Sequence, residues 1–252
     1  MSVQAAVIGA TTWGTTLGIL LAQNDVPVTM LARTQAEAET LASQGRNTRF
    51  LPDAPFPDWL SVTGEPESAL KQSDLVIIAV PSDRLRENVQ RIKPHLRAGA
   101  VVLSATKGLE LPTARRMSQV LQDELPADFH EDICVLSGPN LAKEIVAGKP
   151  ASTVIASKNP DAAQKAQNAL MSAAFRVYTS ADVLGVELAG ALKNIVALGA
   201  GIGDGMGTGE NSKAAFITRG LAEMTRLGIA AGADSLTFAG LAGLGDVVAT
   251  CS

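Results

Sequence analysis

The stretch VQAAVIGATTWG, residues 3–14, decides the fold of this chain. It begins as a short apolar run typical of a buried strand and leads directly into a helical pattern at 13–23. Gly9 suits the tight turn of a dinucleotide-binding fingerprint, the helix N-terminus would face a pyrophosphate, and Gly14 would permit close helix packing. Because Thr11 stands where the fingerprint has its middle glycine, an ordinary strand-to-helix turn stays open as the alternative.

The end of the second apolar run bears on the choice of dinucleotide. It reads LART at 31–34, where an NAD enzyme usually places Asp or Glu against the ribose hydroxyls. Arg33 is found instead, and a guanidinium can pair with a 2′-phosphate. The sequence therefore favours NADP over NAD, with a solvated arginine at a strand end as the alternative.

The first part of the chain alternates apolar runs with helical patterns, which predicts a doubly wound α/β domain. Apolar runs that are continuous rather than alternating indicate a parallel sheet covered on both faces by helices. The segment 46–60 is crowded by Pro52, Pro55 and Pro57, so we expect an ordered loop over the sheet edge. The predicted strands are 3–8, 26–31, 75–80, 101–104, 133–136 and 153–156, and the predicted helices are 13–23, 35–43, 84–96, 114–124 and 161–173.

Strand-like runs disappear after residue 180, and the rest of the chain predicts a helical domain. We expect helices at 182–200, 212–231 and 235–241, with a glycine-dense loop at 203–209. The chain thus divides into a Rossmann-like dinucleotide-binding domain, 1–180, and a helical substrate and catalytic domain, 181–252. Ligand clefts form preferentially at such domain junctions.

The junction helix GVELAGALKN, 185–194, carries the best candidate for chemistry, Lys193. Helical spacing predicts an apolar stripe through Leu188 and Ile195, with Lys193 on the opposite, small-residue face. The plain alternative is that Lys193 extends from a packed helix to solvent and that Glu187 is an ordinary solvated neighbour.

Bulk properties exclude several classes of protein. The chain has 252 residues, 46% of them hydrophobic, with mean hydropathy +0.19, a net charge of −4 and a pI near 5.3. It offers no basic field for nucleic acid, and we expect no membrane span, no signal peptide and a cytoplasmic location. Cys134 and Cys251 predict inert thiols rather than a disulfide or a metal site.

Polar groups at the ends of the other strands are candidate ligand contacts, because doubly wound sheets bind ligands at that edge. They lie in SATKG at 104–108 and in LSGPNLAKE at 136–144, either of which could be a plain turn. Asp246 follows a glycine-rich turn and could lie at a loop tip or point into the cleft. His95 and His130 predict surface side chains, and no Ser-His-Asp set, paired-carboxylate spacing or metal cluster is evident.

Taken together, the motifs resemble those of bacterial-type NAD(P)-dependent glycerol-3-phosphate dehydrogenases. Each motif is weak alone, whereas the full set in this order is highly specific. The motifs are NTRFLP at 47–52, SATKG at 104–108, LSGPNLAK at 136–143, FRVYTS at 175–180, GVELAGALKN at 185–194, ITRGLAEMTRLG at 217–228 and GLAGLGD at 240–246.

The resemblance implies a fold, a reaction and a set of site residues. It implies a helical second domain of the 6-phosphogluconate dehydrogenase type, and hydride transfer from NADPH or NADH to dihydroxyacetone phosphate, giving sn-glycerol 3-phosphate for phospholipid synthesis. Lys193 would be the catalytic acid and base. The implied substrate contacts are Lys107, Gly138, Asn140, Lys193 and Asp246, and the implied cofactor contacts are Gly9, Thr12, Trp13, Gly14, Arg33, Phe50, Lys107 and Ala142.

Hydride delivery to a ketone builds negative charge on oxygen, so a positioned ammonium that can release its proton lowers the barrier. A nearby Lys107 would lower the pKa of Lys193, whereas Asp246 would keep it charged. The sequence leaves open which influence dominates.

The chain departs from the family pattern in three places. Thr11 replaces a glycine, Asn140 replaces a common serine, and a Ser-Arg-Asn segment that holds the substrate phosphate in the family would follow Ser252. We therefore expect an incomplete helical domain and slow turnover by a protein ending at Ser252. A cofactor-binding but catalytically silent homologue is the alternative function, and a homodimer is compatible with the resemblance.

Overall fold

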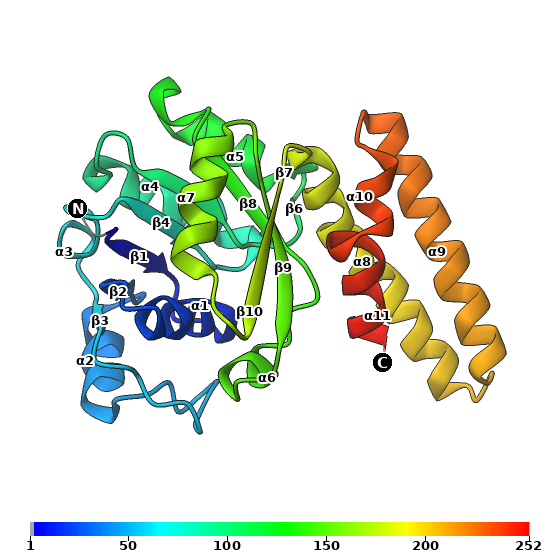
Figure 1. The fold of residues 1–252 in the computed structure, drawn as a ribbon, viewed down its shortest axis with the longest axis horizontal. Helices are drawn as coiled ribbons and strands as arrows, with labels where there is room; N and C mark the ends of the chain where they lie inside the picture. Colours follow the sequence, from blue (N-terminus) through cyan, green and yellow to red (C-terminus); the bar gives the residue numbers. More distant parts are fainter. Residues whose placement is uncertain (1–2, 252) are drawn as a thin grey trace.

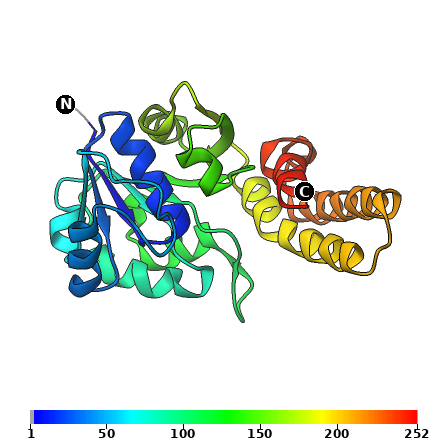
Figure 2. The same cartoon turned by 90° about the horizontal axis from the view of Figure 1, so that it is seen from below.

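The computed structural model describes residues 3–251, which form a sheet domain and a helical domain side by side (Figure 1). Figure 2 shows the same two parts from below, with α8 at the junction. The strands are β1 (Ala5–Ile8), β2 (Val28–Leu31), β3 (Leu60–Thr63), β4 (Leu75–Ile78), β5 (Val101–Ser104), β6 (Leu109–Glu110), β7 (Arg115–Arg116), β8 (Ile133–Ser137), β9 (Ala151–Ser157) and β10 (Phe175–Ser180). The helices are α1 (Thr12–Gln23), α2 (Gln35–Gln44), α3 (Pro66–Leu70), α4 (Leu85–Ile92), α5 (Met117–Glu124), α6 (Ala142–Val146), α7 (Pro160–Leu170), α8 (Val183–Gly205), α9 (Glu210–Ala231), α10 (Ser235–Ala239) and α11 (Asp246–Cys251).

Helices cover both faces of the main sheet, as the continuous apolar strands predicted. One buried cluster joins the sheet to α1, α2, α6 and α7, and a second joins it to α3, α4 and α5. A third cluster lies in the helical domain and reaches Val135 and Ala156 of the sheet. The molecule is therefore a three-layer α/β domain whose last strands also pack against helices.

The strand order β10-β9-β8-β5-β4-β1-β2-β3 contains the six-stranded dinucleotide-binding order from β3 to β8. These six strands are parallel, but β9 runs antiparallel to β8, so the expectation of a wholly parallel sheet is wrong. The reason is the connection, because a parallel crossover needs an element that runs back along the sheet. α6 has only 5 residues, too short for that return.

Most predicted elements are confirmed within a few residues, and the segment 46–60 is irregular as expected. The elements that were not predicted include the short strand β3, the edge strand β10, the β6–β7 hairpin and the short helices α3 and α11. His95 and His130, which were expected on the surface, are both half-buried. The His130 ring lies 3.0 Å from the Leu125 carbonyl oxygen.

The glycine-dense loop expected at 203–209 is confirmed only at 206–209, since α8 continues through Gly205 and α9 begins at Glu210. Glycines weaken an isolated helix, but two others, Gly199 of α8 and Gly220 of α9, let these helices approach each other. A Cβ on Gly199 would lie 2.3 Å from the Phe216 ring, and one on Gly220 would lie 2.8 Å from Val196. The two helices therefore pack closely at Gly199 and Gly220.

The predicted apolar stripe of α8 is confirmed only in part, because Leu188 packs against the core of the helical domain but Ile195 does not. Ile195 is 68% exposed, whereas Val186, Ala189, Lys193 and Val196 are buried. Because α8 contacts both α9 and the sheet, its small residues occupy the crowded faces. Lys193 is therefore held inside the protein rather than extended into solvent.

Among residues 3–251, α8 is long and apolar enough to cross a membrane by length and composition, with mean hydropathy 1.5 over its most apolar window. This corrects the expectation that no run approaches that size. It packs against α9 and β8, and 39% of that window is buried inside the protein.

Candidate active site

The turn after β1 shows why its glycines are required. Gly9 has φ of 106°, and a Cβ there would lie 2.9 Å from the Ala79 carbonyl oxygen, so the chain after β4 would be displaced. A Cβ on Gly14 would lie 2.0 Å from the Gly9 carbonyl oxygen. The turn therefore has the tight geometry of the fingerprint, at the point between β1 and β4 where the strand order reverses.

Thr11 is accommodated by hydrogen bonds toward the protein. Its hydroxyl donates to the Ala79 carbonyl oxygen at 2.8 Å and accepts from the Gly14 amide at 3.0 Å, capping α1. The amides of Thr12 and Trp13 also belong to the first turn, where no carbonyl within the helix can pair with them. The helix N-terminus can therefore still meet a phosphate group.

An elongated groove of about 580 Å³ begins at this turn and extends over the end of β2. Gly9, Thr11, Arg33, Phe50 and Pro81 are among the residues that line it. This volume suits part of a dinucleotide. The groove runs along the carboxyl edge of the sheet, where such cofactors bind.

Four arginines line this groove, and three of them have other partners. Arg91 donates to the Gly64 carbonyl oxygen at 2.6 Å, Arg84 pairs with Glu87 at 3.1 Å, and Arg49 lies 4.9 Å from the centre of the Phe50 ring. Within residues 3–251, the guanidinium of Arg33 has no hydrogen-bond partner, while its amide donates to Glu37 at 2.9 Å. Arg33 is therefore free to bind an added phosphate.

The predicted lysine and aspartate meet at the other end of the carboxyl edge. Lys193 Nζ donates to Asp246 Oδ1 at 2.6 Å and to Thr250 Oγ1 at 2.8 Å. The Asp246 side chain is only 2% exposed, so the aspartate points into the domain junction rather than lying at a loop tip. An ammonium has three N–H groups, and the third remains for a ligand.

Lys107 binds the other oxygen of the same carboxylate. Its Nζ donates to Asp246 Oδ2 and, at 3.1 Å, to the Gly138 carbonyl oxygen. Burial lowers the pKa of Lys107 to about 8, with a further lowering by the Lys193 charge that Asp246 opposes. Lys107, Lys193 and Asp246 therefore form a triad with a net charge of +1 when both lysines are protonated.

The GLAGLGD motif positions Asp246 through a rare backbone turn. Leu241–Gly245 is π-helical and leads straight into α11, which starts at Asp246. A Cβ on Gly243 would lie 2.1 Å from the Phe238 carbonyl oxygen, so only glycine fits this turn. Such π-helical turns are frequent at functional sites.

Two implied contacts lie in a different environment from the triad. The Asn140 amide donates to the Ser152 carbonyl oxygen at 3.1 Å, and its oxygen accepts from Thr153 at 2.9 Å. Asn140 thus fixes the loop after β8 to β9. Ala142 is the first residue of α6.

Two residues at the junction were missed or misread from the sequence. Thr250 lies one helical turn after Asp246, a spacing that could have shown the shared face of α11. The interpretation of Glu187 as a solvated neighbour is wrong, because its side chain is 7% exposed.

The two cysteines fit the expectation of inert thiols. Burial raises the pKa of Cys134 to about 12, and burial also raises the pKa of Cys251. Neither thiol is therefore a nucleophile near neutral pH.

The fold and this site define a class of protein. A groove that suits a dinucleotide on a Rossmann sheet, together with a buried lysine supplied by a helical domain, is the arrangement of a nicotinamide-dependent dehydrogenase.

Comparisons with known proteins narrow that class. The family model of the NAD-dependent glycerol-3-phosphate dehydrogenase N-terminus matches residues 4–163, and that of its C-terminus matches residues 182–252. The chain belongs to the NAD-dependent glycerol-3-phosphate dehydrogenase family.

Individual relatives agree with the family models. The chain is 52% identical to glycerol-3-phosphate dehydrogenase (NAD(P)+) of Dehalococcoides mccartyi, with 99% of this chain and 70% of the relative covered. For the same-named Streptomyces griseus enzyme, the identity is 48%, with 99% and 74% covered. The crystal structure of glycerol-3-phosphate dehydrogenase from Coxiella burnetii superposes with a TM-score of 0.94 at 37% identity, covering 100% of this chain and 76% of that one.

Proposed function

We propose that this protein interconverts dihydroxyacetone phosphate and sn-glycerol 3-phosphate with NAD(P)H, and so supplies glycerophospholipid synthesis. The observation that carries the proposal is the buried triad Lys107–Asp246–Lys193, which joins a lysine of the sheet domain to the lysine and aspartate of the helical domain. Membership of the glycerol-3-phosphate dehydrogenase family supports the same reaction. The alternative of a silent cofactor-binding homologue is not favoured, because the paired acid and base groups would then have no use.

The groups around the groove fit a nicotinamide dinucleotide. The α1 N-terminus would bind the pyrophosphate, and the free Arg33 guanidinium would bind the 2′-phosphate of NADP. When bound, the nicotinamide ring supplies or accepts the hydride. We take residues 1–180 as the domain that holds it and 181–252 as the domain that brings the catalytic lysine.

Lys193 would act as the general acid in the reduction. Its two hydrogen bonds, to Asp246 and Thr250, aim the remaining N–H of the ammonium at the substrate carbonyl oxygen. As negative charge develops there, the ammonium donates its proton and the site keeps a neutral amine. In the oxidation of glycerol 3-phosphate, the same amine would remove the hydroxyl proton.

Lys107 would contribute charge rather than the proton. Two of its N–H groups bind Asp246 and Gly138, which leaves one for the substrate. With both lysines protonated the triad carries net positive charge, which favours an anionic substrate and a developing alkoxide. The Gly138 carbonyl would help hold Lys107 in place.

The test is NADPH oxidation by the purified protein, followed at the absorbance of the reduced cofactor. We expect oxidation only after dihydroxyacetone phosphate is added, with glycerol 3-phosphate as the product identified by mass spectrometry. Dihydroxyacetone without phosphate and an exposed-lysine variant, Lys149→Ala, are the controls, and the variant should retain wild-type turnover because Lys149 is exposed and pairs with Glu144 on the surface. Cofactor binding without any product would support the silent homologue. A cytoplasmic location and a homodimer stay predictions.

A further inference from the structure

A buried carboxylate in the catalytic helix is bound to the sheet domain and has no part in the proposed proton transfer. Glu187 of α8 accepts hydrogen bonds from the Ser118 amide at 2.7 Å, from the Ser118 hydroxyl at 2.6 Å and from Arg116 Nη1 at 2.5 Å. Ser118 and Arg116 belong to the start of α5 and to the strand before it. Glu187 therefore caps a helix of the other domain, where a negative charge is stabilised by the helix dipole.

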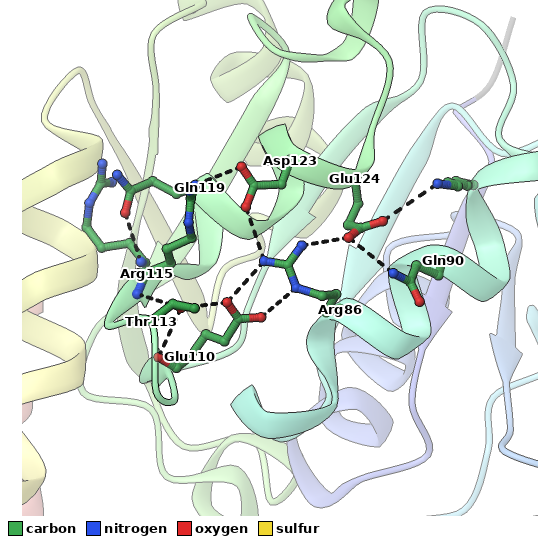
Figure 3. Close-up of polar contacts among 10 residues, drawn as sticks. Arg86, Gln90, Glu110, Thr113, Arg115, Gln119, Asp123 and Glu124 are labelled. Carbon is green, nitrogen blue, oxygen red and sulfur yellow. Dashed lines mark hydrogen bonds and ion pairs between the residues drawn. The ribbon is translucent and has the colours of Figure 1, made fainter.

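The part of the sheet domain that binds Glu187 is held together by a cluster of ion pairs around Arg86. Figure 3 shows Arg86 between three carboxylates, bound to Glu110 at 2.6 and 3.0 Å, to Glu124 at 2.6 Å and to Asp123 at 3.1 Å. The hydrogen bond from Arg86 lowers the pKa of Glu110 to about 2, so this carboxylate is charged at neutral pH. The β6–β7 hairpin, α4 and α5 are thus joined into one unit at the base of the Glu187 contact.

Glu187 binds the sheet domain, whereas Lys193, six residues further along α8, binds Asp246 and Thr250 of α11. Gly190 lies between them, and a Cβ there would lie 2.6 Å from Ser137 Oγ, so the helix backbone lies directly against the end of β8. At 3.6 residues per turn, Gly190 is rotated by about 60° from Glu187 around the helix axis, and Lys193 by about 120°. The carboxylate, the glycine contact and the lysine therefore form an i, i+3 row that winds around α8.

This geometry couples the position of Lys193 to the Glu187 contact. At a rise of 1.5 Å per residue, the two positions are roughly 9 Å apart along the helix axis, so a tilt of about 6° pivoting at Glu187 shifts the backbone at Lys193 by roughly 1 Å. A misplacement of about 1 Å in an active site can reduce the rate about 10²-fold. Rotation of α8 about its own axis would have a similar effect on the direction of the ammonium.

We infer that Glu187 is a positioning residue, which fixes α8 against the N-terminus of α5 and thereby sets the Lys193 ammonium at the substrate carbonyl. The inference rests on the proposed function of Lys193. It assigns the Arg116–Glu187 pair a role in kcat, acting through the orientation of α8 rather than through contact with substrate.

The test compares Glu187→Gln, Arg116→Met and the double variant with the wild type. Glu223→Gln is the matched control, since Glu223 is an exposed α9 glutamate that also pairs with an arginine, Arg226. We expect each test variant to lower kcat about 10- to 100-fold, while KM for dihydroxyacetone phosphate and Kd for NADPH change less than about threefold. The double variant should be no slower than the slower single variant, because both changes release the same contact.

A second readout does not depend on turnover. Amide hydrogen exchange of the segment 187–196 should be faster in Glu187→Gln and Arg116→Met than in the wild type and in Glu223→Gln, with no substrate present. Unchanged exchange in both test variants, or kcat within twofold of the wild type when circular dichroism shows them folded, would overturn the inference. Arg116→Met keeps the test decisive if Glu187→Gln does not fold. A wild type without turnover refutes the proposed function instead, and the exchange measurement then still decides whether Glu187 anchors α8.

Discussion

Replacing Asp246 by asparagine should strongly destabilise the protein, because the carboxylate lies between two ammonium groups. Its side chain is 2% exposed, and its Oδ1 lies 2.6 Å from Lys193 Nζ. At an effective dielectric constant of about 20, unit charges at that distance attract by about 6 kcal/mol. Relief of carboxylate desolvation offsets part of this, and removal of one partner from a buried pair typically costs about 3–5 kcal/mol. We expect Asp246→Asn to lower the free energy of unfolding by that amount near neutral pH.

The destabilisation should also depend on pH, through Lys107. Its pKa in the folded protein is about 8, below the usual 10.5, so the unfolded chain holds more protons between those values and stability rises with pH there. Asp246 opposes this lowering, so its removal takes the folded pKa of Lys107 lower still. At a pH above the pKa of Lys107 in the folded wild type and in the folded Asp246→Asn variant, Lys107 is neutral in both proteins. Its contribution to the loss of stability then disappears. The loss of stability should therefore be smaller by about 1 kcal/mol or more at about pH 9.5 than at about pH 7.

Urea unfolding followed by circular dichroism measures both effects. The matched control is Asp204→Asn, since Asp204 is a half-exposed aspartate paired with Lys213, and the expected loss there is at most about 1 kcal/mol. A loss in Asp246→Asn as small as that of the control, or one that grows from neutral to alkaline pH, would refute the account of the triad.

Three other predictions concern the ligands. Affinity for glycerol 3-phosphate, measured by calorimetry, should fall above about pH 8 as Lys107 loses its charge. This fall should be absent in Lys107→Arg, and a fall that persists in that variant would show that another group is responsible. Arg33→Ala should weaken NADPH binding roughly 10- to 100-fold, because a charge-assisted hydrogen bond is lost, and should leave NADH binding unchanged. Equal effects on both cofactors would show that Arg33 does not bind the 2′-phosphate. Thr11→Gly should lower the free energy of unfolding by about 1 kcal/mol through the lost bond to Ala79, and markedly tighter NADPH binding in that variant would show that the threonine obstructs the turn.

The sheet domain could be predicted well because its strands are continuous apolar runs and its first turn carries a fingerprint. The edge strand β10 escaped prediction because it has no continuous apolar run, its buried and exposed residues alternate, and its pairing with β9 is a tertiary property. The strand β9 was predicted but its antiparallel direction was not, because strand direction depends on the connection and not on the strand's own residues. The length of α8 was underestimated because the low helix propensity of Gly203 and Gly205 indicated a loop.

The site residues could be predicted from the sequence where they belong to recognisable motifs. Lys193, Lys107 and Asp246 could be proposed from sequence, but not their shared carboxylate, since Asp246 lies 53 residues from Lys193 and 139 from Lys107. The roles of Thr250 and Glu187 depend on contacts that only the assembled domains create. Sequence alone could not show that a glutamate on an apolar helix has a buried partner in another domain.

The measurement that tests the central claim most directly is the rate of NADPH oxidation by dihydroxyacetone phosphate in the wild type and in Lys193→Ala, with NADPH affinity measured on the same samples. The account predicts that the variant loses turnover by a factor of about 10² to 10⁴ or more, while its affinity for NADPH stays within about twofold of the wild type. Turnover in Lys193→Ala close to that of the wild type would contradict the assignment of Lys193 as the general acid.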